Sequence, residues 1–279
     1  MMIGIIVLLM VLIGLRVSWQ KKLQKEIKPP MEIGSATFIG DLEVQADAFE
    51  IIEGEAGLLA LLGDGFGKGN LGKVASRAAL NACRSLYLQY KKLTNPQYFF
   101  KRAFNLANFE VLKLLEDRTG GCSLLAAFIH ADELVYALAG DIKICVFRGG
   151  DLIPLSEGHT LSKLAQSAYK TGKLTKQKAL WTLKEERLWN YIGQDGFKDI
   201  ELYDVPVQLK KGDIVLMMTK GVYQNITMCE VESILKDSTL SAKVQAQYII
   251  NAVKDSSNEN KENATVIVTK INQTRKDAV

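Results

Sequence analysis

Apolar and polar positions along the chain predict groups of short strands separated by pairs of helices. Three β-like runs follow one another early in the chain: SATFIG, DAFEII and GLLALL. Apolar positions at helical spacing then predict helices over residues 71–92 and 96–116, the second opening on Asn95-Pro96. Strands return at SLLAAFIH, ELVYALAG and IKICVFRG, which are joined by turns short enough for antiparallel pairing.

The second half of the chain continues this pattern. A polar segment over residues 157–200 is expected to be partly helical, and DIVLMMT is expected to be a strand. Helices over 228–236 and 239–254 precede a last strand, ATVIVTKI. Because the strands come in groups and do not alternate with helices, the pattern predicts an α+β domain of antiparallel sheets with helices on the outside.

The first residues differ from the rest of the chain. MMIGIIVLLMVLIGL carries no charge and is followed by Arg16, Trp19 and a cluster of lysines. We interpret residues 1–19 as a transmembrane anchor, with a signal peptide and an interfacial helix as alternatives. The lysines predict a basic juxtamembrane linker over 20–33 and, by the positive-inside rule, a single-pass membrane protein whose soluble domain is cytoplasmic. Residues 272–279 are expected to form a loose tail.

Charge and cysteine usage exclude several function classes. The chain has 35 basic and 31 acidic residues, a balance that does not indicate a nucleic-acid partner. The four cysteines are widely spaced and form no CxxC pair, so the sequence indicates reduced thiols and no zinc site.

One short segment indicates a ligand site. The run GLLALL ends in Gly63-Asp64-Gly65, an acid between two glycines at the expected end of a buried strand. Glycines allow a ligand to approach the backbone closely, and the carboxylate then faces it. A polar turn after a core strand is the alternative for this segment taken alone.

Two further motifs carry little weight. The run GKGNLGKV nearly fits a phosphate-binding loop, but Val74 occupies the position of the Ser or Thr that would hold magnesium. His130 and His159 have no nucleophile in a catalytic arrangement, so they are expected to be structural.

Five segments in order resemble the metal-dependent protein phosphatases, the PPM or type 2C family. They are QADAF, GDGFG, GGCSLL, the stretch ALAGDIKICVFRGGDLIPLSEGHT, and the pair GDIVLMMTKGV and ENATVIV. The resemblance covers residues 34–271, which we expect to form one PPM-type domain. It implies an αββα sandwich and hydrolysis of phosphoserine and phosphothreonine at a two-metal site, with Mg²⁺ or Mn²⁺ in an active member.

Several site residues carry over from this resemblance. Asp64 stands at the acid that bridges both metals, and Gly65 at the carbonyl ligand beside it. Asp47 stands at the aspartate that supports metal-bound water, and Asp141 at the aspartate of the GD turn. Glu262 replaces an aspartate ligand and keeps its charge.

Three positions depart from the family pattern. Ala46 stands at an acidic metal ligand, Lys220 at the aspartate ligand of the DG block, and Leu42 at the phosphate-gripping arginine. Two carboxylates remain among four ligand positions, and one ammonium is added. Two divalent ions repel each other strongly, and the negative charge that remains at these positions is not expected to hold both. Lys220 is expected to pair with Asp64 or Glu262, although a solvated loop lysine is an alternative.

These departures favour a membrane-anchored pseudophosphatase that binds a phosphoprotein or a kinase-linked signalling partner, with no resident cofactor. The alternative is a phosphatase with full or weak activity, using a single ion at Asp64, Gly65 and Glu262. A purely structural subunit is a third possibility. The catalytic candidates are Asp64, Asp47 and Asp141, and the enzyme assignment stays open at this point.

Overall fold

The computed structural model describes residues 29–274 except 117, 183–186 and 204, together with the isolated residues 13 and 16. Most of the anchor expected over residues 1–19, most of the linker expected over 20–33 and most of the tail expected over 272–279 lie outside the described residues. Within the described part of the chain, no helix has both the length and the apolar character needed to cross a membrane.

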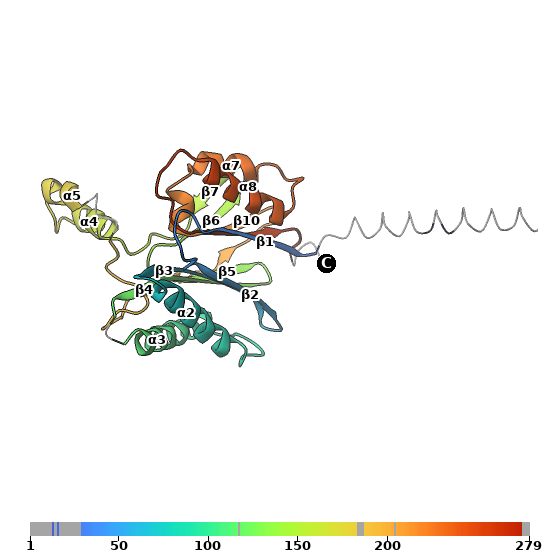
Figure 1. The fold of residues 1–279 in the computed structure, drawn as a ribbon. Helices are drawn as coiled ribbons and strands as arrows, with labels where there is room; N and C mark the ends of the chain where they lie inside the picture. The colour runs from blue at the N-terminus through green and yellow to red at the C-terminus, as the bar shows by residue number, and fades with distance from the viewer. Residues whose placement is uncertain are drawn as a thin grey trace, which may run out of the picture.

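Two antiparallel sheets face each other at the centre of the molecule (Figure 1). The first sheet has the order β1 (Met31–Phe38), β11 (Ala264–Ile271), β10 (Ile214–Met218), β6 (Lys143–Arg148) and β7 (Asp151–Pro154). The second has the order β2 (Ala48–Gly54), β3 (Gly57–Gly67), β4 (Gly120–His130), β5 (Glu133–Ala139) and β8 (Glu201–Leu202), and β9 (Val207–Gln208) also pairs with β5.

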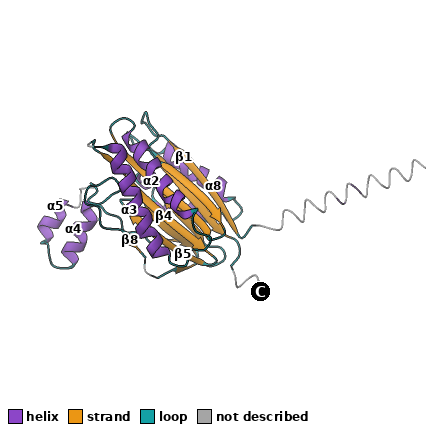
Figure 2. Cartoon of the chain, turned by 90° about the horizontal axis from the view of Figure 1, so that it is seen from below, coloured by secondary structure: helices purple, strands orange, loops and turns teal. Residues whose placement is uncertain are grey.

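Helices cover the outer faces of both sheets. The second sheet carries α2 (Leu71–Tyr87) and α3 (Pro96–Leu115), whereas the first carries α6 (Lys220–Tyr223), α7 (Met228–Leu235) and α8 (Ala242–Asp255). Two further helices, α4 (Leu161–Lys170) and α5 (Lys176–Thr182), project from the body of the sandwich (Figures 1 and 2). The expected αββα arrangement is confirmed.

Three apolar cores explain why so many strands are apolar on both faces. The core between the sheets contains Leu58, Tyr136 and Ile267, all at most 1% exposed. A second core lies between α2, α3 and the second sheet, and a third between the first sheet and α7 and α8. Because both faces of each sheet are covered, the strands need no polar side.

Local signals set several element boundaries. Asn95 caps α3, since its side chain accepts a hydrogen bond from the backbone N–H of Tyr98, and Pro96 follows as expected. Thr227 and Glu230 form a reciprocal capping box at the start of α7. Other boundaries move: β1 begins at Met31, before the expected SATFIG run, and the helix expected to reach residue 92 ends at Tyr87.

The four cysteines are free. Cys83, Cys122 and Cys145 are buried, whereas Cys229 is exposed on α7.

The strand containing Asp64 is longer than the sequence indicates. We expected it to end near Leu62, yet β3 continues through Gly67 and stays paired with β4 as far as Gly120. The glycines allow the strand to pack closely against α2. A Cβ atom on Gly65 would lie 2.1 Å from the carbonyl oxygen of Gly72 in α2. Asp64 is therefore held inside a paired strand, which fixes its direction more firmly than a turn would.

Candidate functional site

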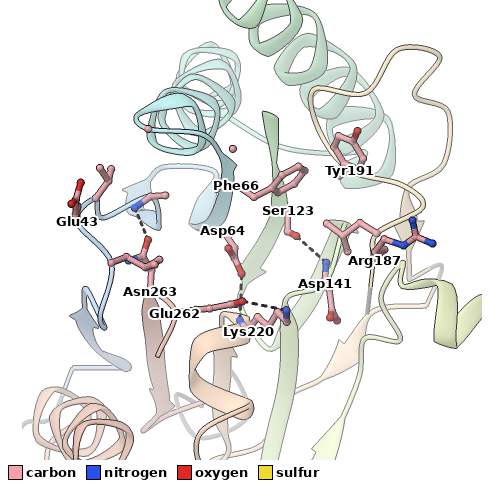
Figure 3. A pocket seen from close by; sticks show the side chains of 17 residues that line it. Glu43, Asp64, Phe66, Ser123, Asp141, Arg187, Tyr191, Lys220, Glu262 and Asn263 are labelled. Carbon is pink, nitrogen blue, oxygen red and sulfur yellow. Dashed lines mark hydrogen bonds and ion pairs between the residues drawn. The ribbon is translucent and has the colours of Figure 1, made fainter. Parts of the chain in front are cut away.

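A cavity of about 760 Å³ lies at one edge of the sandwich, where the end of β3 meets the loops before β11, α6 and β2 (Figure 3). Seven of the eight site residues expected from the sequence line it: Leu42, Ala46, Asp64, Gly65, Asp141, Lys220 and Glu262. The eighth, Asp47, lies beside Ala46 in the chain and is 8% exposed. The end of β3, the end of β10 before Thr219 and the start of β11 after Asn263 therefore meet at this edge.

Asp64 is the most strongly perturbed acid of the cavity. Burial raises the pKa of its carboxyl well above the usual range, and the neighbouring charges of Asp47 and Glu262 raise it further. The backbone N–H of Lys220 donates to Asp64 Oδ2 at 3.4 Å and opposes the rise. This N–H belongs to the first residue of α6, so the short helix begins at the carboxylate.

The side chain of Lys220 pairs with Glu262. Its Nζ lies 3.5 Å from Glu262 Oε1, and Figure 3 shows the two side chains meeting just below Asp64. The predicted ion pair is confirmed for Glu262, whereas the contact with Asp64 that the structure gives comes from the backbone of Lys220. The two side chains are 25% and 48% exposed, so water screens the pair.

Asp47 lies deeper, beneath the cavity floor. The hydroxyl of Thr219 donates to its Oδ2 at 2.8 Å, while its Oδ1 is buried without a hydrogen-bond partner. Burial raises the pKa of Asp47 to about 6, and the hydroxyl groups of Thr265 and Thr219 limit the rise. The carboxyl therefore lies in a place that favours its neutral form.

The backbone of Ala46 is held from two sides. Its N–H donates to Asn263 Oδ1 at 2.7 Å, and its carbonyl accepts from the hydroxyl of Ser76 at 2.6 Å. Asn263 also donates to the carbonyl of Ile39 at 2.7 Å. These bonds join the loop before β2, helix α2 and the loop before β11.

Asp141 enters the cavity from the turn between β5 and β6. Its N–H donates to the hydroxyl of Ser123 at 3.0 Å, and Gly140 before it adopts a φ of 105°. The N–H of Gly140 donates to Nδ1 of His159 at 3.0 Å. His159 is thus a buried structural residue, as expected, and it supports the turn that carries Asp141.

Sequence reasoning missed part of the cavity wall. Arg187 and Tyr191 line it from the segment after α5, and Figure 3 shows Arg187 across the cavity from Glu43. Tyr191 makes an edge-to-face contact with Phe66 at 5.0 Å between ring centroids. The bridge between Cys122 and Ile192 holds this segment against β4. No local pattern marks these residues, because only the tertiary fold brings their segment over the site.

The donor set fits a pair of divalent ions poorly. Hard cations need several oxygen ligands, mostly carboxylates. Asp64 and Glu262 supply carboxylates and Gly65 a backbone carbonyl, but Ala46 supplies no side-chain oxygen and an ammonium contacts Glu262. Within the described ranges, no group of three or more His, Cys, Asp or Glu side chains is placed to hold a metal ion.

Searches by sequence and by fold both find serine/threonine phosphatases among known proteins. No protein-family profile matches the chain. The serine/threonine phosphatase stp of Listeria monocytogenes is 25% identical over 226 residues, covering 78% of this chain and 86% of that protein.

Solved structures show the same fold. The serine/threonine phosphatase of S. agalactiae superposes with a TM-score of 0.76 at 22% identity, covering 86% of this chain and 99% of that one. The catalytic domain of the phosphatase PstP superposes with a TM-score of 0.66 at 19% identity, covering 87% and 99%, and its structure contains two manganese ions.

Proposed function

Because this chain belongs to the PPM, or type 2C-like, phosphatase family, we propose that it is a pseudophosphatase whose cavity binds a phosphorylated segment of a protein partner. The observation that carries the proposal is the ion pair between Lys220 and Glu262 at the cavity floor. An ammonium within reach of the carboxylates competes with a divalent ion for the same oxygens. It also supplies positive charge at a position where the family resemblance implies a metal ligand.

Two cationic side chains line the cavity in which we place the phosphate group. Lys220 rises from the floor and Arg187 lines the opposite wall. An arginine fork donates two parallel hydrogen bonds to phosphate oxygens, a function that Leu42 cannot supply. The raised pKa of Asp64 reduces the negative charge that a bound phosphate meets.

Catalytic activity at a single-ion site is the alternative. The named activity of the relatives favours it, as do the retained carboxylates of Asp64, Asp47 and Asp141. In this case Asp64, the Gly65 carbonyl and Glu262 would hold one Mg²⁺ or Mn²⁺ ion.

Release of phosphate from a phosphothreonine peptide in manganese separates the two functions. We expect the wild-type protein to release no more phosphate than its Asp64→Asn variant. The same peptide should bind more tightly than its unphosphorylated form, and Lys220→Ala with Arg187→Ala should abolish the difference. Hydrolysis by the wild type that disappears in Asp64→Asn would establish the enzyme and overturn the proposal.

The N-terminal sequence supports a second part of the proposal, a single membrane anchor over residues 1–19 with the phosphatase-like domain in the cytoplasm. The apolar run followed by Arg16 and a lysine cluster supports this orientation. The full chain should sediment with membranes and resist extraction by high salt. Removal of residues 1–28 should release a soluble, folded product, whereas an aggregated product would show that the apolar segment belongs to the core.

A further inference from the structure

Helices α4 and α5 form a hairpin that stands away from the sandwich (Figures 1 and 2). In α4 only Ala165 is buried, and the capping residue Thr160 fixes its start by accepting a hydrogen bond from the N–H of Lys163. At its base, an antiparallel bridge joins Thr160 to Leu188. The hairpin is thus a helical extension whose surface is largely open to solvent.

The charge of this hairpin is one-sided. Residues 158–184 contain six lysines and no Asp or Glu, although the whole chain has 35 basic and 31 acidic residues. Five of these lysines lie among the described residues and are exposed: Lys163, Lys170, Lys173, Lys176 and Lys178. A single-sign patch on a chain of nearly balanced charge attracts acidic partners and orients them before contact.

Apolar side chains lie between these lysines. Leu164 and Tyr169 on α4 are each 46% exposed, and Leu180 on α5 is 53% exposed. Exposed leucines and a tyrosine among lysines form a surface that suits a segment with both acidic and apolar side chains.

The hairpin leads directly into the candidate site. Leu188, which forms the basal bridge with Thr160, lines the cavity together with Arg187. His159, just before Thr160, accepts from the N–H of Gly140 next to Asp141. The base of the hairpin therefore borders the cavity.

We propose that the α4–α5 hairpin docks an acidic segment with apolar side chains, belonging to the same protein partner whose phosphorylated residue enters the cavity. The inference rests on the proposed function, because it supplies the partner class for that cavity. Figure 1 places the hairpin at one end of the molecule and the start of β1 at the other. That separation from the membrane-proximal end favours a protein over a lipid surface as the occupant.

The test uses the full chain and an unphosphorylated fluorescent peptide rich in Glu, Leu and Phe. Its control is the same peptide with every Glu replaced by Lys. The acidic peptide should bind, its affinity should fall with added salt, and the lysine peptide should not bind. Lys170→Glu with Lys173→Glu and Lys176→Glu should weaken binding at least about tenfold. The matched triple variant at Lys91, Lys92 and Lys101, which are exposed just before and within α3, should bind as the wild type does.

Hydrogen exchange of the wild type locates the docking site without relying on any substituted variant. In the wild type, the acidic peptide should slow exchange over residues 161–182 and leave the outer face of α3 unchanged. Equal binding of the two peptides, an equal loss in both triple variants, or protection outside the hairpin would overturn the proposal. Binding to phosphatidylserine vesicles through the hairpin lysines, without binding of the acidic peptide, would show a lipid surface and also overturn it.

The outcome is separable from that of the proposed function. Lys220→Ala with Arg187→Ala should leave binding of the unphosphorylated acidic peptide unchanged, because the hairpin makes that contact. If the chain proves to be an active phosphatase while the acidic peptide still docks on the hairpin, the proposed function fails and the docking inference stands.

Discussion

The side chain of Asn263 accepts a 2.7 Å hydrogen bond from the backbone N–H of Ala46, across 217 positions of the chain. The bond joins the loop before β11 to the loop before β2 at the edge of the cavity. Asn263 is 5% exposed, and its amide also donates to Ile39. These two hydrogen bonds thus tie the two loops together at the cavity edge.

Asn263→Ala should lower the free energy of unfolding by about 1–3 kcal/mol, because it leaves the N–H of Ala46 and the carbonyl of Ile39 without this partner. Urea unfolding in the presence of EDTA measures the change. Asn105→Ala is the matched control, since Asn105 is exposed on α3 and bonds only within its own helix. A loss no larger than that of the control would show that the two loops do not depend on Asn263.

Replacement of Lys220 should change metal binding. The wild type should show no rise in melting temperature with Mn²⁺, because the ammonium competes for the oxygens of Glu262. Lys220→Asp removes that competition and adds a carboxylate, so Mn²⁺ should raise the melting temperature of this variant. Lys211→Asp, a change at an exposed lysine lining a different cavity, is the control. An equal response in the wild type would contradict the assigned role of Lys220.

Turnover should need more than this one change. We expect phosphate release only when Lys220→Asp is combined with Ala46→Glu and Leu42→Arg, because the first two restore carboxylates and the third restores a planar phosphate fork. Phosphopeptide hydrolysis in manganese, measured for each single, double and triple variant, checks this. Activity in Lys220→Asp alone would show that Ala46 and Leu42 do not limit catalysis.

Asp47 should make stability depend on pH. Its pKa rises from 3.8 to about 6 on folding, so the native state binds more protons than the unfolded state between these values. The contribution of Asp47 to stability is therefore lost as pH rises through this window. Asp47→Asn should remove the loss. The difference in unfolding free energy between the variant and the wild type should therefore shift in favour of the variant by about 1–3 kcal/mol from acidic pH to pH 7. Urea unfolding of both proteins across the window measures the difference, and parallel pH profiles would refute it.

Gly65→Ala should destabilise the fold by roughly 2–3 kcal/mol, because the new Cβ would meet the Gly72 carbonyl at 2.1 Å and force α2 away from β3. Gly54→Ala is the control, since a Cβ there would meet only the side chain of Tyr87 at 3.9 Å, an ordinary van der Waals contact. Thermal unfolding of both variants checks the prediction. Equal melting temperatures would mean that β3 and α2 can separate at no cost.

Periodicity and turn chemistry determined much of this fold. The apolar runs that became β4, β5 and β10 are recognisable because each is covered on both faces, and Asn95-Pro96 marks the start of α3 by local hydrogen bonding alone. The order of the five motif segments was enough to indicate the αββα arrangement and to single out Asp64, Lys220 and Glu262. These features depend on neighbours in sequence or on a spacing that the chain itself displays.

Other features were decided by contacts between distant segments. The extension of β3 past Gly63 depends on pairing with β4 and on the close approach of α2 at Gly72, which no local pattern displays. Arg187 and Tyr191 line the cavity because the segment after α5 is bridged to β4 at Cys122. The ammonium of Lys220 contacts Glu262, and the backbone N–H of Lys220 donates to Asp64, because α6 begins directly beneath the Asp64 carboxylate. The sequence alone thus supplied the chemical groups, and the packing of sheets and helices decided which of them meet.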